Sequence, residues 1–179
     1  MLLNKAKKTR FGPRLVGQAD LTKLDRELIS LAEEASRSAY APYSNFHVGA
    51  AIRSADGGLT TGCNVENVSY GVTMCAEVGA VMAAVRQRRL PMDAIAIYGR
   101  LGGPDAPGPR TGKPLAPCGR CRQVLAEMAL AGQSHELRII CSDPARDHAL
   151  VGTISDFLPG ALDDGLVETL IESKVALVG

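Results

Sequence analysis

The sequence contains no tryptophan, three phenylalanines and four tyrosines, so aromatic residues make up only 4% of its 179 positions. Proteins that bind single-stranded nucleic acid use aromatic side chains as stacking platforms along a basic groove. Net charge is also small, because 20 Lys and Arg are offset by 19 Asp and Glu to give +1. The composition therefore argues against a nucleic acid partner and favours a small, weakly charged ligand.

Long hydrophobic runs are missing too. No apolar stretch approaches the roughly 20 residues of a membrane-spanning helix, and the start, Met1-Leu2-Leu3-Asn4-Lys5, lacks the apolar stretch of a signal peptide. We therefore expect a cytoplasmic protein without a membrane partner. Five cysteines are too few, and odd in number, for a disulfide scaffold. A reducing compartment would leave them as thiols that can bind metal.

Hydrophobic residues make up 46% of the chain, which is enough for one compact domain but short for two. Residues 1–18 combine several Lys and Arg with Gly and Pro and show no apolar periodicity. We expect this segment to be a flexible basic arm, and residues 19–179 to form a single catalytic domain.

The hydrophobic pattern predicts alternating helices and strands behind this arm. A Thr22/Asp25 pair is typical of a helix cap, and residues 100–113 hold four Gly and three Pro, which predicts a surface insertion. The pattern gives helices at 20–40, 75–86 and 118–130, and strands at 46–52, 59–64, 94–98 and 137–141. We expect an α/β fold, a single three-layer domain with a mixed sheet flanked by helices.

Three cysteines stand at the starts of two predicted helices. Cys118 and Cys121 lie three positions apart, so both thiols can face one ion, and Cys75 can supply a third ligand. Three protein ligands leave a fourth position for water, as at catalytic zinc sites, and helix N-termini favour the thiolate form. Glu77, two residues after Cys75, is the candidate for moving protons. The sequence therefore predicts one Zn²⁺ per chain with a bound water.

Five motifs occur in order between Ala39 and about Leu130. They are Tyr40-Ala41-Pro42-Tyr43-Ser44, Phe46-His47-Val48-Gly49-Ala50-Ala51, Cys63-Asn64-Val65-Glu66-Asn67, Cys75-Ala76-Glu77 and Pro117-Cys118-Gly119-Arg120-Cys121-Arg122-Gln123. Together they resemble the cytidine deaminase family, in its three-cysteine, homotetrameric branch. The resemblance implies zinc-dependent hydrolysis of cytidine or deoxycytidine to uridine or deoxyuridine and ammonia, a reaction of pyrimidine salvage.

The resemblance also implies roles for residues that bind the nucleoside. Phe46 packs against the pyrimidine, the backbone around Ala76 reads the base, and Asn64 and Glu66 bind the ribose hydroxyls. The last assignment agrees with the residue types, because side chains two apart on an extended segment face the same way. Tyr70 resembles the tyrosine that reaches into a neighbouring subunit's site.

Two positions depart from the family pattern. The family continues Cys-Ala-Glu with an arginine that reduces the charge of the zinc thiolates, but position 78 is Val. Arg122 matches the second family arginine with that task, so we expect it to tune the metal, and we expect Arg120 on a solvated helix face. Leu162 stands where the family has a phenylalanine that stacks in a neighbour's site.

Other functions remain open at the level of sequence. Blasticidin-S deaminase shares the second cysteine motif and also lacks the arginine after Cys-Ala-Glu, the position that Val78 occupies here, although the complete ribose motif favours a cytidine substrate. A non-enzymatic zinc module would close its coordination with Cys63, Cys141 or His47, but we expect both cysteines to be buried strand residues. A polynucleotide editor would need the aromatic platforms and basic channel that this chain lacks.

Overall fold

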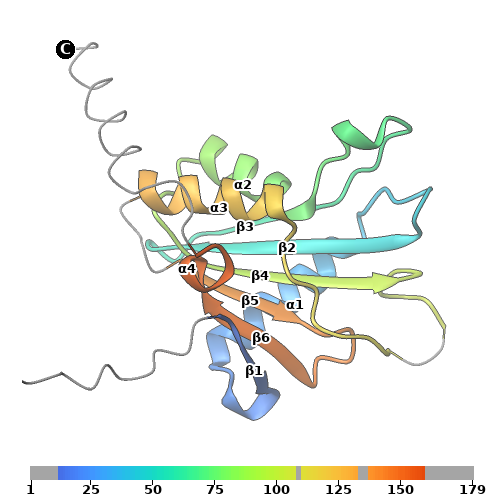
Figure 1. The fold of residues 1–179 in the computed structure, drawn as a ribbon, viewed down its shortest axis with the longest axis horizontal. Coiled ribbons are helices and arrows are strands. Elements are labelled where there is room, and N and C mark those ends of the chain that lie inside the picture. The colour runs from blue at the N-terminus through green and yellow to red at the C-terminus, as the bar shows by residue number, and fades with distance from the viewer. Residues whose placement is uncertain (1–11, 108–109, 133–136, 160–179) are drawn as a thin grey trace, which may run out of the picture.

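The computed structural model describes residues 12–107, 110–132 and 137–159 (Figure 1). Within these ranges, six strands form one mixed sheet in the order β1-β6-β5-β4-β2-β3, in which only β4 and β5 are parallel neighbours. The strands are β1 (Arg14–Gly17), β2 (Phe46–Ser54), β3 (Leu59–Cys63), β4 (Met92–Leu101), β5 (Arg138–Ser142) and β6 (His148–Thr153).

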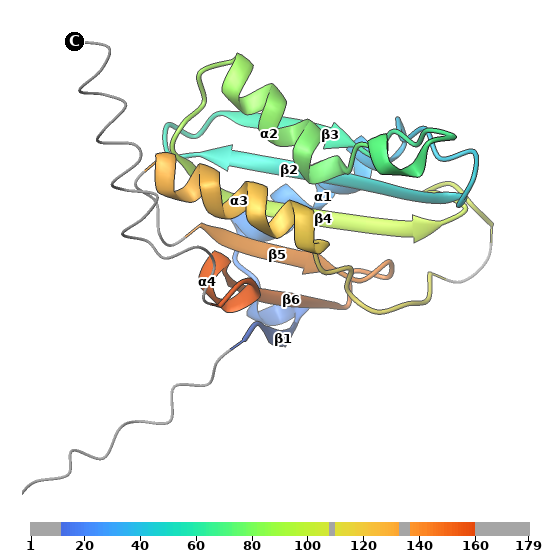
Figure 2. The same ribbon diagram turned by 45° about the horizontal axis from the view of Figure 1, so that its top comes forward.

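Helices cover both faces of the sheet. Helix α1 (Lys23–Ser36) packs on one face, while α2 (Ala76–Arg86) and α3 (Gly119–Ala131) lie side by side on the other (Figures 1 and 2). A short α4 (Ile154–Phe157) follows β6, and single 3₁₀ turns occupy Gln18–Asp20 (η1) and Tyr70–Val72 (η2). The expected three-layer α/β domain with a mixed sheet is confirmed.

Side-chain alternation on the central strands separates two apolar cores. Ala50 and Ile52 of β2 face α2 and α3, whereas Ala51 faces α1. Because β2 and β4 are buried on both faces, their sequences read as nearly continuous apolar runs. Gly49 brings α1 close to the sheet, since a Cβ there would lie 2.0 Å from the Ala32 carbonyl oxygen.

The expected helix cap is confirmed: the Asp25 amide donates to Thr22 Oγ1 at 3.1 Å and the Thr22 amide donates to Asp25 Oδ2 at 3.0 Å. The expectation of a flexible arm to residue 18 is wrong for Arg14–Gly17, which pairs with β6 as the edge strand β1. Backbone hydrogen bonds form this pair without an alternating side-chain pattern, and Leu15 is 62% exposed. Residues 1–11 and Leu162 lie outside the described residues.

None of the described helices is both long enough and apolar enough to cross a membrane.

Candidate metal centre

The starts of α2 and α3 bring the three cysteines together. Cys75 is the N-cap residue of α2, Cys118 is the N-cap residue of α3, and Cys121 is buried in the first turn of α3. The two helices begin at the same end of the sheet (Figure 2). Their first N–H groups have no partner within the helix and carry partial positive charge, which favours thiolates at this position.

The sulfur spacing fits a tetrahedral zinc ion. Cys75 Sγ lies 4.0 Å from Cys118 Sγ, which lies 3.5 Å from Cys121 Sγ, and all three sulfurs are within 4.8 Å of one another. Four ligands about 2.3 Å from zinc in a tetrahedron are separated by about 3.8 Å. Among the described residues, this trio is the cluster with metal-ligand geometry. The residues present therefore fit Zn²⁺ with one position left for water.

The other two cysteines have different surroundings. Cys63 Sγ contacts the Ser38 carbonyl oxygen at 3.3 Å, and Cys141 is fully buried in β5, where burial raises the pKa of its thiol. Neither belongs to the metal cluster. A closed four-cysteine structural zinc site therefore has no support in the described part of the chain.

In the absence of metal, the thiols of the cluster are linked by hydrogen bonds that shift their pKa values. A hydrogen bond from Cys121, together with those from Arg120 and Cys118, lowers the pKa of Cys75 to about 5 despite partial burial. The same bond to Cys75 raises the pKa of Cys121 above its ordinary value. Near neutral pH Cys75 therefore carries a thiolate while Cys121 keeps its proton, and a metal ion would displace that proton.

Glu77 lies in the first turn of α2 beside the thiols and is only 5% exposed. Burial raises the pKa of its carboxyl, and the neighbouring negative charge of Cys75 acts in the same direction. A carboxyl group with a raised pKa can both accept and release a proton near neutral pH. Its position and environment therefore suit a proton carrier.

Arg120, and not Arg122, donates to a zinc-site sulfur. Arg120 Nη2 lies 3.4 Å from Cys75 Sγ and 2.5 Å from the Thr73 carbonyl oxygen. Arg122 instead donates from Nε to the Pro117 carbonyl oxygen at 2.8 Å and from Nη1 to that of Phe157 at 3.1 Å. This arrangement differs from the expected assignment of charge compensation to Arg122 and of Arg120 to a solvated face.

The reason for the difference is helical phase. Residues two apart on an α-helix point about 200° away from each other, so Arg120 and Arg122 cannot face the same neighbour. Position 120 faces the start of α2, and position 122 faces the segment before α3 and the end of α4. In the sequence, the absence of arginine at position 78 indicates that another cation of the motif must compensate the negative charge of the thiolates.

The residues expected to bind ribose also organise the backbone of the site. Asn64 accepts from the Val48 amide at 2.8 Å and donates to the Phe46 carbonyl oxygen at 2.9 Å. The Glu66 carboxylate accepts from the Tyr43 amide at 2.9 Å, the Ser44 amide at 3.2 Å and the Ser44 hydroxyl, which lowers its pKa. The motif therefore holds the turn before β2 in place.

The remaining predicted residues lie nearby in the fold. Phe46 opens β2 and is half-buried, and Ala76 is the first residue of α2, with a buried side chain that leaves its backbone as the polar group. Tyr70 lies on η2, is 65% exposed, and packs against Tyr43 with ring centroids 5.8 Å apart. Its contact in this chain is therefore with the turn that Glu66 holds.

A three-thiol cluster with an open fourth position and a buried carboxyl group beside it defines the class of zinc-dependent hydrolytic enzymes. The family model described as the cytidine and deoxycytidylate deaminase zinc-binding region matches residues 22–132. The cytidine deaminase of Halalkalibacterium halodurans is 39% identical over 139 residues, which cover 77% of this chain and 94% of that protein. That of Mycobacterium tuberculosis is 43% identical over 138 residues, covering 74% and 86%.

A solved structure also resembles this chain. A crystal structure of cytidine deaminase from Burkholderia pseudomallei superposes with a TM-score of 0.66 at 39% identity, covering 79% of this chain and 100% of that one. The chain therefore belongs to the cytidine deaminase family.

Proposed function

We propose that the protein hydrolyses cytidine and deoxycytidine to uridine and deoxyuridine and releases ammonia. The observation that carries this proposal is the cluster of Cys75, Cys118 and Cys121 at two adjoining helix starts, with the buried Glu77 carboxyl beside it. Membership in the cytidine deaminase family and the named activity of the relatives support the same substrate.

The chain's own residues would bind the nucleoside and move its protons. When bound by the three thiolates, zinc lowers the pKa of a coordinated water and so supplies a nucleophile near neutral pH. Glu77 would accept a proton from the attacking water and deliver protons to N3 of the pyrimidine and to the departing amino group. Water then contributes the new carbonyl oxygen at C4, and the amino group leaves as ammonia.

Two further assignments concern affinity and electrostatics. Asn64 and Glu66 would bind the ribose hydroxyls with the donor and acceptor capacity that their backbone contacts leave open. Phe46 would pack against the pyrimidine, and the backbone at Ala76 would read the base. We assign compensation of the thiolate charge to Arg120, because it donates directly to Cys75.

We also propose a cytoplasmic homotetramer acting in pyrimidine salvage. Five free cysteines, three of them gathered as metal ligands, suit a reducing compartment. Exposed apolar side chains support an interface: Val68, Tyr70 and Val72 are 78%, 65% and 62% exposed, and Met82 and Val85 lie exposed on α2. Light scattering should show a four-chain assembly, and an active monomer would contradict this part of the proposal.

An absorbance assay with cytidine, deoxycytidine and blasticidin S, run side by side on zinc-loaded protein, tests the activity. Turnover of the two nucleosides with little turnover of the antibiotic supports the proposal. Turnover of blasticidin S alone would replace it with the rival deaminase activity. Chelation of the metal should abolish turnover and zinc should restore it, which tests whether the activity depends on the metal.

A further inference from the structure

The Gly- and Pro-rich segment between β4 and α3 connects the two faces of the sheet. It begins on the α1 side, where buried Arg100 donates to the carbonyl oxygens of Pro104 and Ala106, both at 2.8 Å. It ends on the opposite side at Cys118, the metal ligand that caps α3. Residues 111–118 form neither helix nor strand, so contacts other than ladder hydrogen bonds must fix their path.

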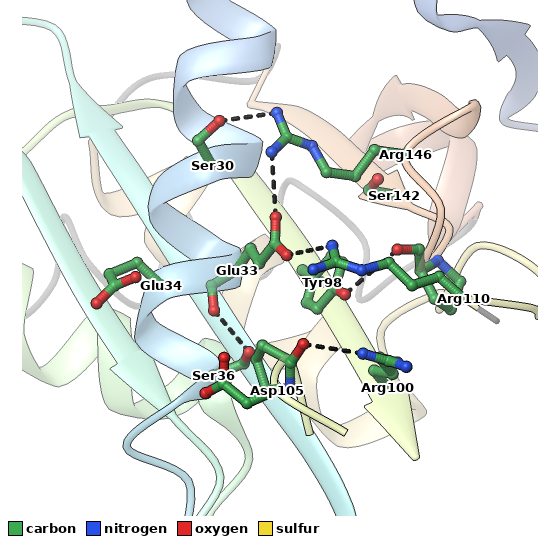
Figure 3. Close-up of polar contacts among 12 residues, drawn as sticks. Ser30, Glu33, Glu34, Ser36, Tyr98, Arg100, Asp105, Arg110, Ser142 and Arg146 are labelled. Carbon is green, nitrogen blue, oxygen red and sulfur yellow. Dashed lines mark hydrogen bonds and ion pairs between the residues drawn. The ribbon is translucent and has the colours of Figure 1, made fainter. Parts of the chain in front are cut away.

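One such contact lies on the α1 face. Glu33 of α1 is 8% exposed and accepts from Arg110 Nη1 at 2.5 Å and from Arg146 Nη1 at 3.1 Å, so one carboxylate lies between two guanidinium groups (Figure 3). Arg146 also donates to the Ser30 hydroxyl at 2.8 Å. Arg110 belongs to the insertion, whereas Arg146 belongs to the loop between β5 and β6. The buried carboxylate therefore attaches the insertion to α1.

A second contact lies on the metal face, five residues further along. A Cβ placed on Gly99 of β4 would lie 2.7 Å from Leu115 Cδ2 and 2.9 Å from Phe46 Cε1. The side chains of Leu115 and Phe46 therefore flank the same glycine. Leu115 is only three residues before the metal ligand Cys118. The segment that joins the insertion to α3 thus places an apolar side chain beside the residue assigned to the pyrimidine.

We propose that Leu115 forms part of the pyrimidine-binding wall together with Phe46, and that the ion pair between Glu33 and Arg110 positions it from the other side of the sheet. This inference rests on the proposed function. Leu115 follows Arg110 by five positions, a reach of at most about 18 Å, so the anchor limits where Leu115 can lie. Gly112 adds a contact within this span, since a Cβ there would lie 3.2 Å from Pro144 Cγ.

Steady-state kinetics with cytidine on zinc-loaded protein test the proposal. Leu115→Ala should raise KM about fivefold with kcat within about twofold, because a binding contact is lost and the reacting groups are unchanged. Arg110→Gln should also raise KM, because loss of the ion pair with Glu33 would displace Leu115. The double variant should then be no worse than Leu115→Ala alone, because both changes act through one side chain.

Arg146→Gln is the matched control, since it removes a donor to the same Glu33 carboxylate without touching the insertion. It should lower the melting temperature and leave the KM for cytidine unchanged. Equal KM effects of Arg110→Gln and Arg146→Gln, additive effects in the double variant, or an unchanged KM in Leu115→Ala would overturn the inference. Absence of cytidine turnover in the wild-type protein would reject the proposed function and this inference with it.

Discussion

Arg120→Gln tests the electrostatics of the metal centre. The substitution removes a guanidinium whose Nη2 lies 3.4 Å from Cys75 Sγ and also holds the Thr73 carbonyl oxygen. A hydrogen bond to a charged group contributes about 1.5–3 kcal/mol, and the exposure of Arg120 places it at the lower end of that range. We therefore expect a loss of about 1.5 kcal/mol, or roughly tenfold in zinc affinity.

The assay is competition for zinc against a chelator of known affinity, followed by kcat/KM for cytidine at saturating zinc. Arg122→Gln is the control, because Arg122 donates to the backbone carbonyls of Pro117 and Phe157. That variant should lower the melting temperature and change zinc affinity less than Arg120→Gln. A silent Arg120→Gln combined with weakened zinc binding in Arg122→Gln would refute the assignment of charge compensation to Arg120.

Three other predictions concern the thiols, the ribose motif and the packing of α1. In the metal-free protein, the Cys75 pKa of about 5 means that its thiolate is populated at neutral pH. The rate at which iodoacetamide alkylates Cys75 should therefore rise with pH and reach half its maximum near pH 5. A half-maximal rate near pH 9 would contradict this prediction. Glu66→Ala should reduce kcat/KM for cytidine by at least about tenfold more than it reduces kcat/KM for free cytosine. Equal losses for cytidine and cytosine would show that Glu66 does not bind the ribose. Gly49→Ala should cost about 3 kcal/mol or more in urea unfolding, because the new Cβ would lie 2.0 Å from the Ala32 carbonyl oxygen. Gly71→Ala, with open space around it, should stay within about 0.5 kcal/mol.

Much of the fold could be predicted because its central elements are buried on defined faces. The helix behind the Thr22 cap, the hairpin and the two cysteine-led helices all follow from periodicity and capping chemistry. Strand β1 could not be predicted, since it is held to β6 through its backbone at the sheet edge. The sequence of β1 has no alternation of apolar and polar residues that would distinguish it from the flexible basic arm.

The metal ligands could be predicted for a related reason: spacing and helix starts bring Cys75, Cys118 and Cys121 together. The arginine that donates to the Cys75 sulfur could not be predicted from the sequence. The choice between Arg120 and Arg122 depends on how α3 is rotated against α2. Likewise, the backbone contacts of the ribose motif form between segments that are distant in sequence. Family resemblance supplies a residue's role in binding but not these contacts.

Glu77→Gln tests the central claim most directly, because Gln keeps the shape of the buried side chain but cannot act as an acid or a base. Zinc content and melting temperature, measured on the same preparation, establish that the metal site is intact. With zinc bound, turnover of cytidine should fall by at least about 100-fold, the scale of a lost proton-transfer group. A zinc-loaded Glu77→Gln protein that deaminates cytidine at close to the wild-type rate would contradict the account.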